Sequence, residues 1–522
     1  MRKCKKIDQL RPKSLHMIRY QSTRQLSLEG FAPFCDQLDE DNRWMRMERA
    51  LPWDELAGSY HRALSADQGR PAVDARRVIG AMIIKHKEGL DDRGTVQAIR
   101  ENPYMQWFCG FSAFSTEPIF DASLLVTLRK RMGARVFEGL QQAIVGCMPL
   151  GTKATTRKKK GAQQEDNDKP PPTHKGELKI DATVAPQKIA YPTDLDLLNT
   201  SRECTEGLID ALSKHLALPI KPRTHRRGAR KAYLQVIKKK KRTRQEIRKA
   251  IGKQLRYLRR NIGHIEKLWH DGTPWPLKSA QQRAYWVVQQ LYAQQMHMYQ
   301  ERTHRVADRI VSVHQPHVRP MVRGKAAANV EFGAKLNVAL CDGVAWLDHL
   351  DWNAHNESAW LIDHVERYKQ RLGYYPRAVN VDGIYGTRDN RAALNLLGIR
   401  FIGKALGRPT AESLTPAAKR ALNREMAQRN HIEGKFGQAK NAYGLGRIGA
   451  RLKATSEAWI RMIFLVLNLV TLERRLPPSP FGPFRFARAI IQRVSFLLAH
   501  ALHFLRSCLH APPYLNPSLR CL

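Results

Sequence analysis

Hydrophobic positions in the first part of the chain recur at helical spacing, which predicts an all-α domain over residues 1–150. One periodic run follows Gly69-Arg70-Pro71 and ends at Gly89, and Asp91-Asp92 can cap a second helix. Two short helices joined by a tight turn are typical of a helix-turn-helix, although such hairpins also pack merely as scaffold. The pattern leaves open whether this hairpin contacts DNA.

Short alternations of apolar and polar residues follow, and they predict the strands of one sheet. Residues 178–184 form the first strand, and residues 330–340 and 344–350 form a hairpin around Asp342-Gly343. The next elements are a helix over residues 356–372, strands over residues 377–382 and 400–403, and one long helix over residues 415–443. This order predicts an α/β fold with a mixed sheet.

A large helical insertion separates the first strand from the hairpin, over about residues 197–310. Its residues 221–260 carry 18 Lys or Arg against one acid, Glu246. A charge run of this kind is usually only a solvated face. Here Leu255, Leu258 and other apolar residues are interleaved with the charges, which favours helices with an apolar seam and a basic outer face for a phosphate backbone. The candidate DNA-binding residues of this segment are Arg226, Arg227, Lys239 and Lys240.

The net charge points to the kind of partner. The 522 residues include 88 Lys or Arg and 47 Asp or Glu, which gives a formal net charge of +41. An excess of this size is most simply explained by binding to nucleic acid. The first residues lack the apolar core of a signal peptide. The most apolar window, residues 459–472, contains Arg461 and Asn468 and is shorter than the roughly 20 residues of a membrane span. We therefore expect a cytoplasmic protein with a buried core helix and no membrane contact.

Composition also indicates the domain boundaries. Residues 151–177 are basic and proline-rich and have little to bury, so we expect a linker. A second domain over residues 178–472 and a C-terminal tail over residues 473–522 follow it. The eight cysteines are scattered without a C-x-x-C pair, which indicates neither a disulfide framework nor a zinc site.

Three acids lie on elements that can meet in space. Asp181 lies in the first strand, Asp382 ends a later strand, and Glu433 lies on the last predicted helix. A mixed sheet can place the middle of one strand beside the end of another, with a helix across them. Such a cluster of carboxylates suits two divalent ions. Each acid also has an ordinary explanation, namely local backbone bonding, turn chemistry before Gly383, and a surface ion pair.

Two cations flank Glu433 at helical spacing. Arg429 precedes it by four residues and Lys440 follows it by seven, so all three project from nearly the same face of a helix. That face would present a metal-binding carboxylate between two phosphate-binding groups. The ordinary alternative is an i,i+4 ion pair between Arg429 and Glu433 on an exposed helix.

The motifs around these acids resemble those of the DDE transposases of bacterial insertion sequences. Asp181 lies in KIDAT, Asp382 in VDGIYGT, and Glu433 in RNHIEGKFGQAK, which is similar to the R-x3-E-x6-K signature of that family. The similarity extends over about residues 27–472 and includes the segments RPMVRGK, EFGAK, WNAHNES and YGL. It implies an RNase H-like catalytic core behind an N-terminal helical transposase domain.

The resemblance also implies a chemistry and a set of partners. Asp181, Asp382 and Glu433 would bind two Mg²⁺ or Mn²⁺ ions and catalyse DNA strand cleavage and strand transfer, without a covalent protein intermediate. The partners would be double-stranded DNA, as terminal inverted repeats and as target, and other copies of the chain in a dimer or higher oligomer near the bacterial nucleoid. The residues in contact with DNA would include Arg429, Lys440, Arg323 and Lys325.

The resemblance is not complete, and alternatives stay open. The family often has Tyr three residues before the Arg of the signature, whereas this chain has Met426, a difference that bears on DNA positioning and not on the metal site. Tyr385 is a weaker site candidate, because packing explains it equally well. A nuclease or resolvase on the same fold would cut DNA without joining ends. A non-catalytic DNA-binding protein derived from a transposase is the other alternative.

Overall fold

The computed structural model describes most of the chain between residues 38 and 476. The described residues are 38–62, 64, 72–148, 174–269, 274–325, 328–404, 406–407 and 415–476. Gly69-Arg70-Pro71, most of the predicted linker and nearly all of the predicted tail lie outside them.

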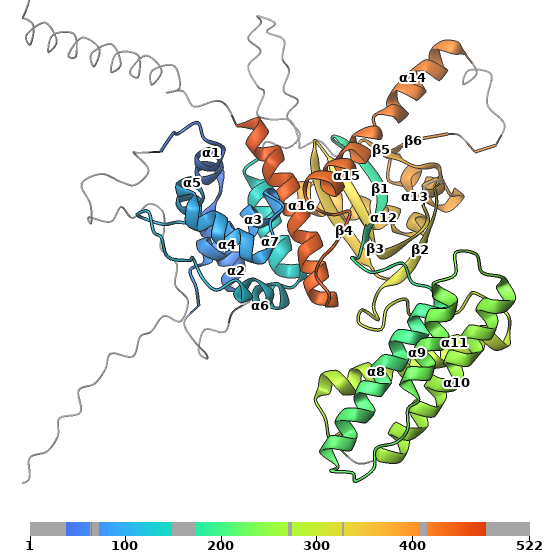
Figure 1. Cartoon of the computed structure of the whole chain (residues 1–522). Helices are drawn as coiled ribbons and strands as arrows, with labels where there is room; N and C mark the ends of the chain where they lie inside the picture. Colours follow the sequence, from blue (N-terminus) through green and yellow to red (C-terminus); the bar gives the residue numbers. More distant parts are fainter. Residues whose placement is uncertain are drawn as a thin grey trace, which may run out of the picture.

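The N-terminal part is a bundle of helices (Figure 1). Its described helices are α1 (Arg43–Ala50), α2 (Trp53–His61), α3 (Ala75–Lys87), α4 (Asp92–Glu101), α5 (Pro103–Phe108), α6 (Ser123–Arg131) and α7 (Ala134–Gly146). The predicted helical hairpin is confirmed as α3 and α4, which are capped by Asp74 and Asp91. Between them Gly89 has a φ of +66°, a conformation that favours glycine. Because α3 is buried along nearly its whole length, it is a core helix of this bundle.

The second part is built on a six-stranded mixed sheet. Its strands are β1 (Glu177–Pro186), β2 (Arg319–Lys325), β3 (Ala328–Cys341), β4 (Val344–Asp351), β5 (Ala378–Val381) and β6 (Arg400–Ile402). Their order is β2-β3-β1-β5-β6, and β4 also pairs with β3. The pairs among β1, β2, β3 and β4 are antiparallel, whereas β5 runs parallel to β1 and β6 to β5. The predicted hairpin is confirmed, with a positive φ at both Asp342 and Gly343.

Helices cover both faces of the sheet (Figure 1). On one face η2 (Glu357–Trp360) continues into α12 (Leu361–Leu372), whose Val365 shares a core with Val379 of β5. On the other face lie α15 (Asn430–Ala442) and α16 (Lys453–Arg475), where Ile432 and Ile463 share a core with Val338 of β3. The helix α13 (Arg388–Leu396) connects β5 to β6.

The helix α16 joins the N-terminal bundle to the sheet. Its Met462 and Leu469 belong to the core of the bundle, whereas its Ile463 and Leu467 belong to a core of the sheet. Among the described residues it is the helix whose length and apolar composition would suffice to cross a membrane, but 83% of its apolar window is buried inside the protein. The core helix predicted around residues 459–472 is therefore confirmed.

The single helix predicted over residues 415–443 is wrong, because the structure breaks it in two. The first part, α14 (Pro416–Ala427), buries none of its residues and projects from the body (Figure 1). At the break the N–H of Arg429 donates to the carbonyl of Met426 at 3.1 Å, and the N–H of Ile432 donates to that of Arg429 at 2.9 Å. These bonds span three residues instead of the four of an α-helix. Helical periodicity continues across such a break, so the sequence pattern does not reveal it.

The predicted helical insertion is confirmed between β1 and β2. Its helices are α8 (Asp194–His215), α9 (Arg226–Ile237), α10 (Arg244–Leu268) and α11 (Ser279–Gln300). They form a separate bundle beside the sheet (Figure 1). Leu198, Leu258 and Leu291 lie in a core formed within the insertion. The insertion therefore has apolar packing of its own, distinct from that of the sheet.

Candidate active site

Parallel pairing of β1 with β5 brings two of the predicted acids together. Ile180 pairs with Val381, and Asp181 and Asp382 are the next residues on the two strands. Because neighbouring strands lie about 4.8 Å apart, the two acids lie side by side where β5 ends. The middle of one strand thus stands beside the end of another, as the sequence predicts.

Burial dominates the protonation of Asp181. Its side chain is only 15% exposed, and the loss of hydration raises the pKa of its carboxyl to about 6. The N–H of Ala182, which donates to Oδ1 at 2.8 Å, and the charge of Arg429 both lower this pKa. The nearby acids Glu357 and Asp382 raise it further. A dehydrated carboxylate among other acids is a group that a divalent cation would stabilise.

Asp382 is exposed and begins the short turn η3 (Gly383–Tyr385). Its Oδ1 accepts a hydrogen bond from the N–H of Gly383 at 2.7 Å, which is the local contact expected of an Asp-Gly turn. Tyr385 is completely buried in the core beneath α12. Its ring therefore has a packing role, which was one of the two explanations that the sequence left open.

Arg429 links the helix acid to the strand acid. Its Nη1 lies 2.9 Å from Oδ2 of Asp181, and its Nη2 lies 2.9 Å from Oε1 of Glu433. Arg429 is the residue before α15, at the break that separates α14 from α15. The i,i+4 ion pair of an exposed helix therefore forms, but the same guanidinium also binds the acid in the sheet.

The three acids approach one another without closing into one ligand group. Among the described residues, the oxygen atoms of Asp181, Asp382 and Glu433 do not all lie within 4.8 Å of one another. Like charges repel unless a cation lies between them, and here the guanidinium of Arg429 binds Asp181 and Glu433 together. The guanidinium of Arg429 thus serves as the counterion of these two carboxylates.

Of the other predicted cations near the core, Lys440 lies on the same helix as Glu433, whereas Arg323 and Lys325 lie on a strand far from the acids. Lys440 is half-buried near the end of α15, seven residues beyond Glu433. Arg323 and Lys325 lie on β2, which pairs with the far end of β3, and their side chains lie outside the described part. Lys325 pairs with Ala328 of β3, whereas Asp181 pairs with Val338 of the same strand. Measured along β3, these two positions are about 30 Å apart. The structure therefore does not bring Arg323 and Lys325 to the acids.

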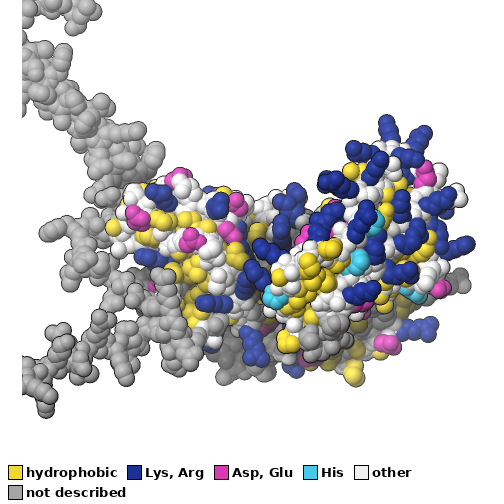
Figure 2. Space-filling view, turned by 60° about the horizontal axis from the view of Figure 1, so that its bottom comes forward, with side chains coloured by type: hydrophobic (Ala, Val, Ile, Leu, Met, Phe, Trp, Pro, Cys, Tyr) yellow, Lys and Arg dark blue, Asp and Glu magenta, His cyan; other side chains and the backbone are white. Residues whose placement is uncertain are grey.

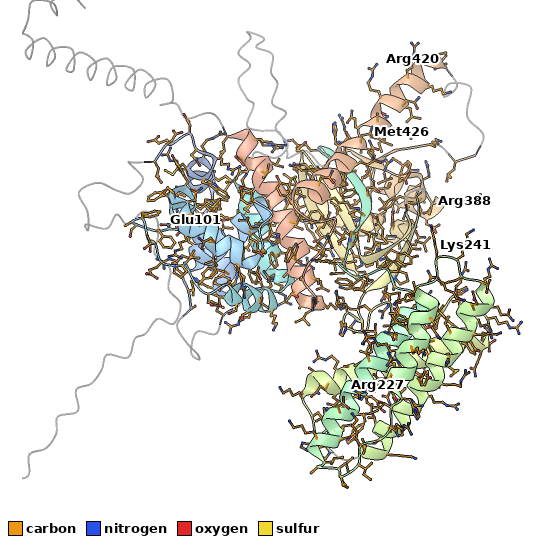
Figure 3. All side chains as sticks on the ribbon, viewed as in Figure 1. Glu101, Arg227, Lys241, Arg388, Arg420 and Met426 are labelled. Atoms are coloured by element: carbon orange, nitrogen blue, oxygen red, sulfur yellow. The ribbon has the colours of Figure 1, made fainter. Side chains whose placement is uncertain are left out.

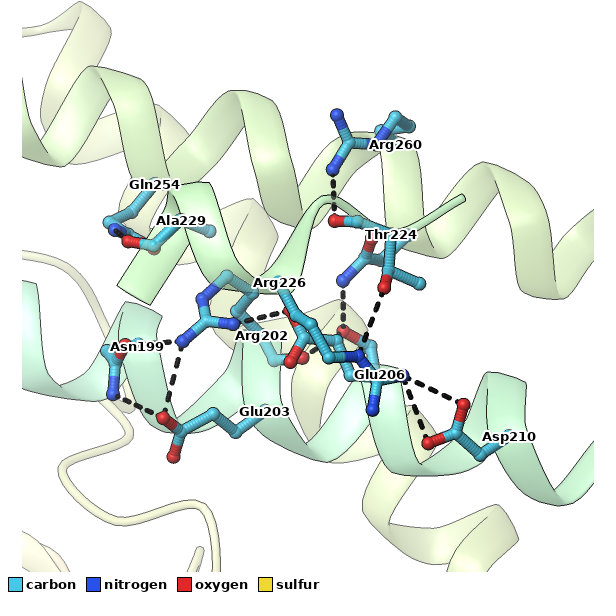
Figure 4. A network of polar contacts seen from close by, with 12 residues as sticks. Asn199, Arg202, Glu203, Glu206, Asp210, Thr224, Arg226, Ala229, Gln254 and Arg260 are labelled. Carbon is cyan, nitrogen blue, oxygen red and sulfur yellow. Dashed lines mark hydrogen bonds and ion pairs between the residues drawn. The ribbon is translucent and has the colours of Figure 1, made fainter. Parts of the chain in front are cut away.

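Two of the four cations of the insertion that are predicted to bind DNA form ion pairs within the protein. Arg226 pairs with Asp210 at 2.8 Å, within a polar network that joins α8, α9 and α10 (Figure 4). Lys239 pairs with Glu246 at 2.6 Å. Part of their charge is therefore neutralised within the protein.

The outer face of α9 is basic and exposed, and it includes Arg227; Lys240 is exposed just beyond the end of this helix. A shallow groove on this face is lined by Arg227, Arg230, Lys231, Leu234, Gln235 and Lys238. Figure 2 shows Lys and Arg side chains gathered over the insertion, and Figure 3 places Arg227 and Lys241 there. The insertion therefore presents a positive surface to solvent.

Sequence reasoning did not single out one acid at the site, Glu357. It is the first residue of η2, and its charge raises the pKa of both Asp181 and Tyr385. The sequence did hold a signal, because Glu357 lies in the segment WNAHNES, which resembles the transposase family. Periodicity assigned this segment only to the start of a helix.

A second group of metal-type ligands lies at the end of β4. His349, Asp351 and His355 offer atoms that all lie within 4.8 Å of one another. Burial lowers the pKa of both histidines, which keeps their rings neutral. Imidazole suits zinc or copper better than magnesium, and the nearby charge of Lys335 opposes a further cation. This group therefore does not replace the carboxylates as a magnesium site.

Comparisons with known proteins agree with the two-part architecture. Residues 33–131 match the family "Transposase domain (DUF772)", and residues 379–470 match "Transposase DDE domain". The second match contains Asp382 and Glu433 but not Asp181. A curated relative is the "Uncharacterized protein ORF8 in nfe locus" of Rhizobium meliloti, 34% identical over 153 residues. That alignment covers 29% of this chain and 64% of the relative. No solved structure matches the chain.

The fold and the acids together define an RNase H-like core, a mixed sheet with carboxylates where β1 and β5 meet. This core follows a helical transposase domain and contains the matched DDE domain. Two parts of the chain thus match transposase domain families, and the chain is similar to the DDE transposases of bacterial insertion sequences.

Proposed function

We propose that this protein cleaves DNA strands at the ends of an insertion sequence and joins the freed 3′ ends to target DNA, in a reaction that depends on divalent metal ions. The observation that carries the proposal is the pairing of β1 with β5, which sets Asp181 beside Asp382 while Arg429 holds Glu433 to Asp181. Acids from two strands and a helix, distant in sequence, therefore face one region.

The residues present fit a hard divalent cation. The three acids offer only oxygen ligands, which Mg²⁺ and Mn²⁺ prefer. Burial of Asp181 among other acids supports the fit, because a bound cation would relieve the cost that its raised pKa reflects. Asp181, Asp382 and Glu433 would hold two such ions. When bound, the ions supply charge that activates water and stabilises the leaving oxygen at phosphorus.

The side chains of the protein would position the DNA. Arg429 would leave the two acids and form bidentate hydrogen bonds with a phosphate, whereas Lys440 would act as a point charge. Together with the ions that they would hold, the acids would place the attacking water in line with the scissile bond. They would later place the 3′-hydroxyl of the cut strand in the same way. No side chain needs to form a covalent intermediate.

The insertion would bind the rest of the DNA. Its exposed cations, Arg227 and Lys240 among them, suit the sugar-phosphate backbone of inverted repeats or target. We further propose that the protein acts at the nucleoid as a dimer or higher oligomer, because two transposon ends must be joined in one reaction.

Strand cleavage and strand transfer on DNA that carries the element's own ends test this function. With Mg²⁺ the wild-type protein should give both products, and Asp382→Asn should lower both rates by at least about a hundredfold, as loss of a metal ligand does. Asp389→Asn, an exposed acid on α13, is the matched control and should retain the wild-type rates.

Three outcomes would contradict the proposal. Wild-type rates in Asp382→Asn would remove the acids from the chemistry. Cleavage without strand transfer would indicate a nuclease or resolvase. Specific DNA binding without metal-dependent cleavage would indicate a non-catalytic DNA-binding protein.

A further inference from the structure

The acid Glu357 enters the site from a different element than the three acids of the signature. It begins η2, the turn that leads from β4 into α12. The charge of Glu357 acts on both Asp181 and the hydroxyl of Tyr385. Glu357 therefore lies close to the region that Asp181 and Asp382 share.

The side chain of Asn390 fixes this proximity. Its Nδ2 donates to the carbonyl of Ser358 at 2.8 Å and to the carbonyl of Tyr385 at 2.9 Å. One bond thus reaches the residue after Glu357, and the other reaches the turn that begins at Asp382. The two turns are tied together, so the positions of Glu357 and Asp382 are set by the fold.

A buried hydroxyl points into the same region. Tyr385 is completely buried, and burial raises the pKa of its hydroxyl, as do the charges of Glu357, Asp181 and Asp382 and a hydrogen bond with Glu357. This hydroxyl therefore links Glu357 to the region that Asp181 and Asp382 share.

Lys335 is the counterion of Glu357. Its Nζ lies 2.8 Å from Oε1 of Glu357 and donates to the carbonyl of His355 at 2.8 Å. Both charged side chains are mostly buried, at 17% and 20% exposure. Lys335 thus balances the charge of Glu357, just as Arg429 balances the charges of Asp181 and Glu433. Each of these acids is held by a basic side chain.

We propose that Glu357 is a fourth carboxylate of the metal centre, and that Lys335 holds it when metal is absent. This inference rests on the proposed function, because it concerns the same divalent ions. It assigns Glu357 to the ions directly or through one water, and it predicts competition between the ions and Lys335 for the same carboxylate.

Binding of Mn²⁺ to the full chain, followed by the electron paramagnetic resonance signal of free Mn²⁺, tests the inference. Glu357→Gln should weaken the affinity for Mn²⁺ by about tenfold, the lower end of the effect of losing a group that supports a metal site. Lys335→Gln should strengthen it, because the carboxylate is then released. Asp363→Asn on α12, an acid paired with Arg367, is the matched control and should bind Mn²⁺ like the wild type.

The opposite signs separate this proposal from a purely structural ion pair. Loss of a structural pair would lower the thermal midpoint of Glu357→Gln and Lys335→Gln alike and would leave their Mn²⁺ affinities unchanged or shift both the same way. Either result would overturn the inference.

Asp382→Asn separates failure of the inference from failure of the proposed function. If this variant loses Mn²⁺ and strand transfer while Glu357→Gln binds like the wild type, the inference fails and the proposed function stands. If the wild-type chain does not bind Mn²⁺, both fail.

Discussion

Arg429 controls the charges of the site at the scale of single residues. Its guanidinium balances Asp181 and Glu433 at the same time, which allows two acids to approach each other. Asp181 also accepts a local backbone bond, and so does Asp382. The ordinary local contacts of each acid therefore coexist with the convergence that the proposed metal site requires. Local backbone contacts hold the carboxylates of Asp181 and Asp382 in place.

Asp181→Asn should stabilise the protein in the absence of metal, by an amount that depends on pH. The pKa of Asp181 rises from its ordinary 3.8 to about 6 on folding, so the folded chain binds the proton more tightly. The ionised carboxylate thus lowers the free energy of unfolding. This penalty is absent below about pH 4, grows between about pH 4 and 6, and is complete above pH 6. The full cost is on the order of 2 to 3 kcal/mol.

Thermal midpoints measured with a chelator at pH 4 to 8 check this expectation. The midpoint of the variant should exceed that of the wild type at pH 7 and equal it near pH 4. A difference of the same size at both ends of the range would contradict the burial of Asp181.

At the scale of elements, α16 completes the edge of the sheet. Within the described strands β4 pairs only with β3, which leaves backbone groups on its other side. Oδ1 of Asn468 accepts from the N–H of Ala345, and its Nδ2 donates to the carbonyl of Ala345, both at 2.8 Å. This amide takes the place of a neighbouring strand and covers an edge that could otherwise pair with another chain. The polar residue within the apolar window is explained by this contact.

Asn468→Leu should therefore destabilise the protein despite adding an apolar side chain to the core. The substitution leaves the buried N–H of Ala345 without its partner, at a cost of about 1 to 3 kcal/mol, while the carbonyl of Ala345 keeps the hydrogen bond from Nε2 of Gln141. A lower thermal midpoint is expected. The matched control is Leu467→Met, one residue away on the same helix, which should change the unfolding free energy by less than about 1.5 kcal/mol. Equal midpoints for the two variants would show that the amide bonds contribute nothing.

At the scale of the whole molecule, the charge is distributed unevenly. Asp210 and Glu246 neutralise nearby cations of the insertion, while the outer face of α9 stays positive. The projecting helix α14 adds Lys419, Arg420 and Arg424 outside the body (Figure 3). The core, the insertion and α14 thus offer several surfaces to one polyanion.

Replacement of Arg227, Arg230 and Lys231 by Gln should weaken DNA binding at every sequence. Loss of three phosphate contacts should reduce the slope of log affinity against log salt by about three. Fluorescence anisotropy on duplex DNA between 50 and 200 mM salt, roughly the range over which such contacts act, measures both effects.

The single variants Arg226→Gln and Arg227→Gln are matched neighbours on the same helix. Arg227 is exposed and Arg226 is paired with Asp210, so Arg227→Gln should weaken binding more. Equal or reversed effects would place the DNA elsewhere than on the outer face of α9.

Most elements of the fold follow from local patterns. Alternation predicts every strand of the sheet except β2, the Asp342-Gly343 pair predicts the hairpin turn, and Asp91 predicts a helix start. Each of these signals acts within a few residues, so the sequence alone contains it. The break before Arg429 has no such signal, since both sides of it keep helical spacing.

The sequence by itself predicted most of the elements, the positive charge and the three candidate acids, because spacing and composition are written along the chain. Tertiary structure decided the register that sets Asp181 beside Asp382, and it decided which cations are paired and which are exposed. It also brought Glu357 to the site and gave Arg429 two acids to hold. These outcomes depend on contacts through space between distant segments, and a pattern along one chain does not record such contacts.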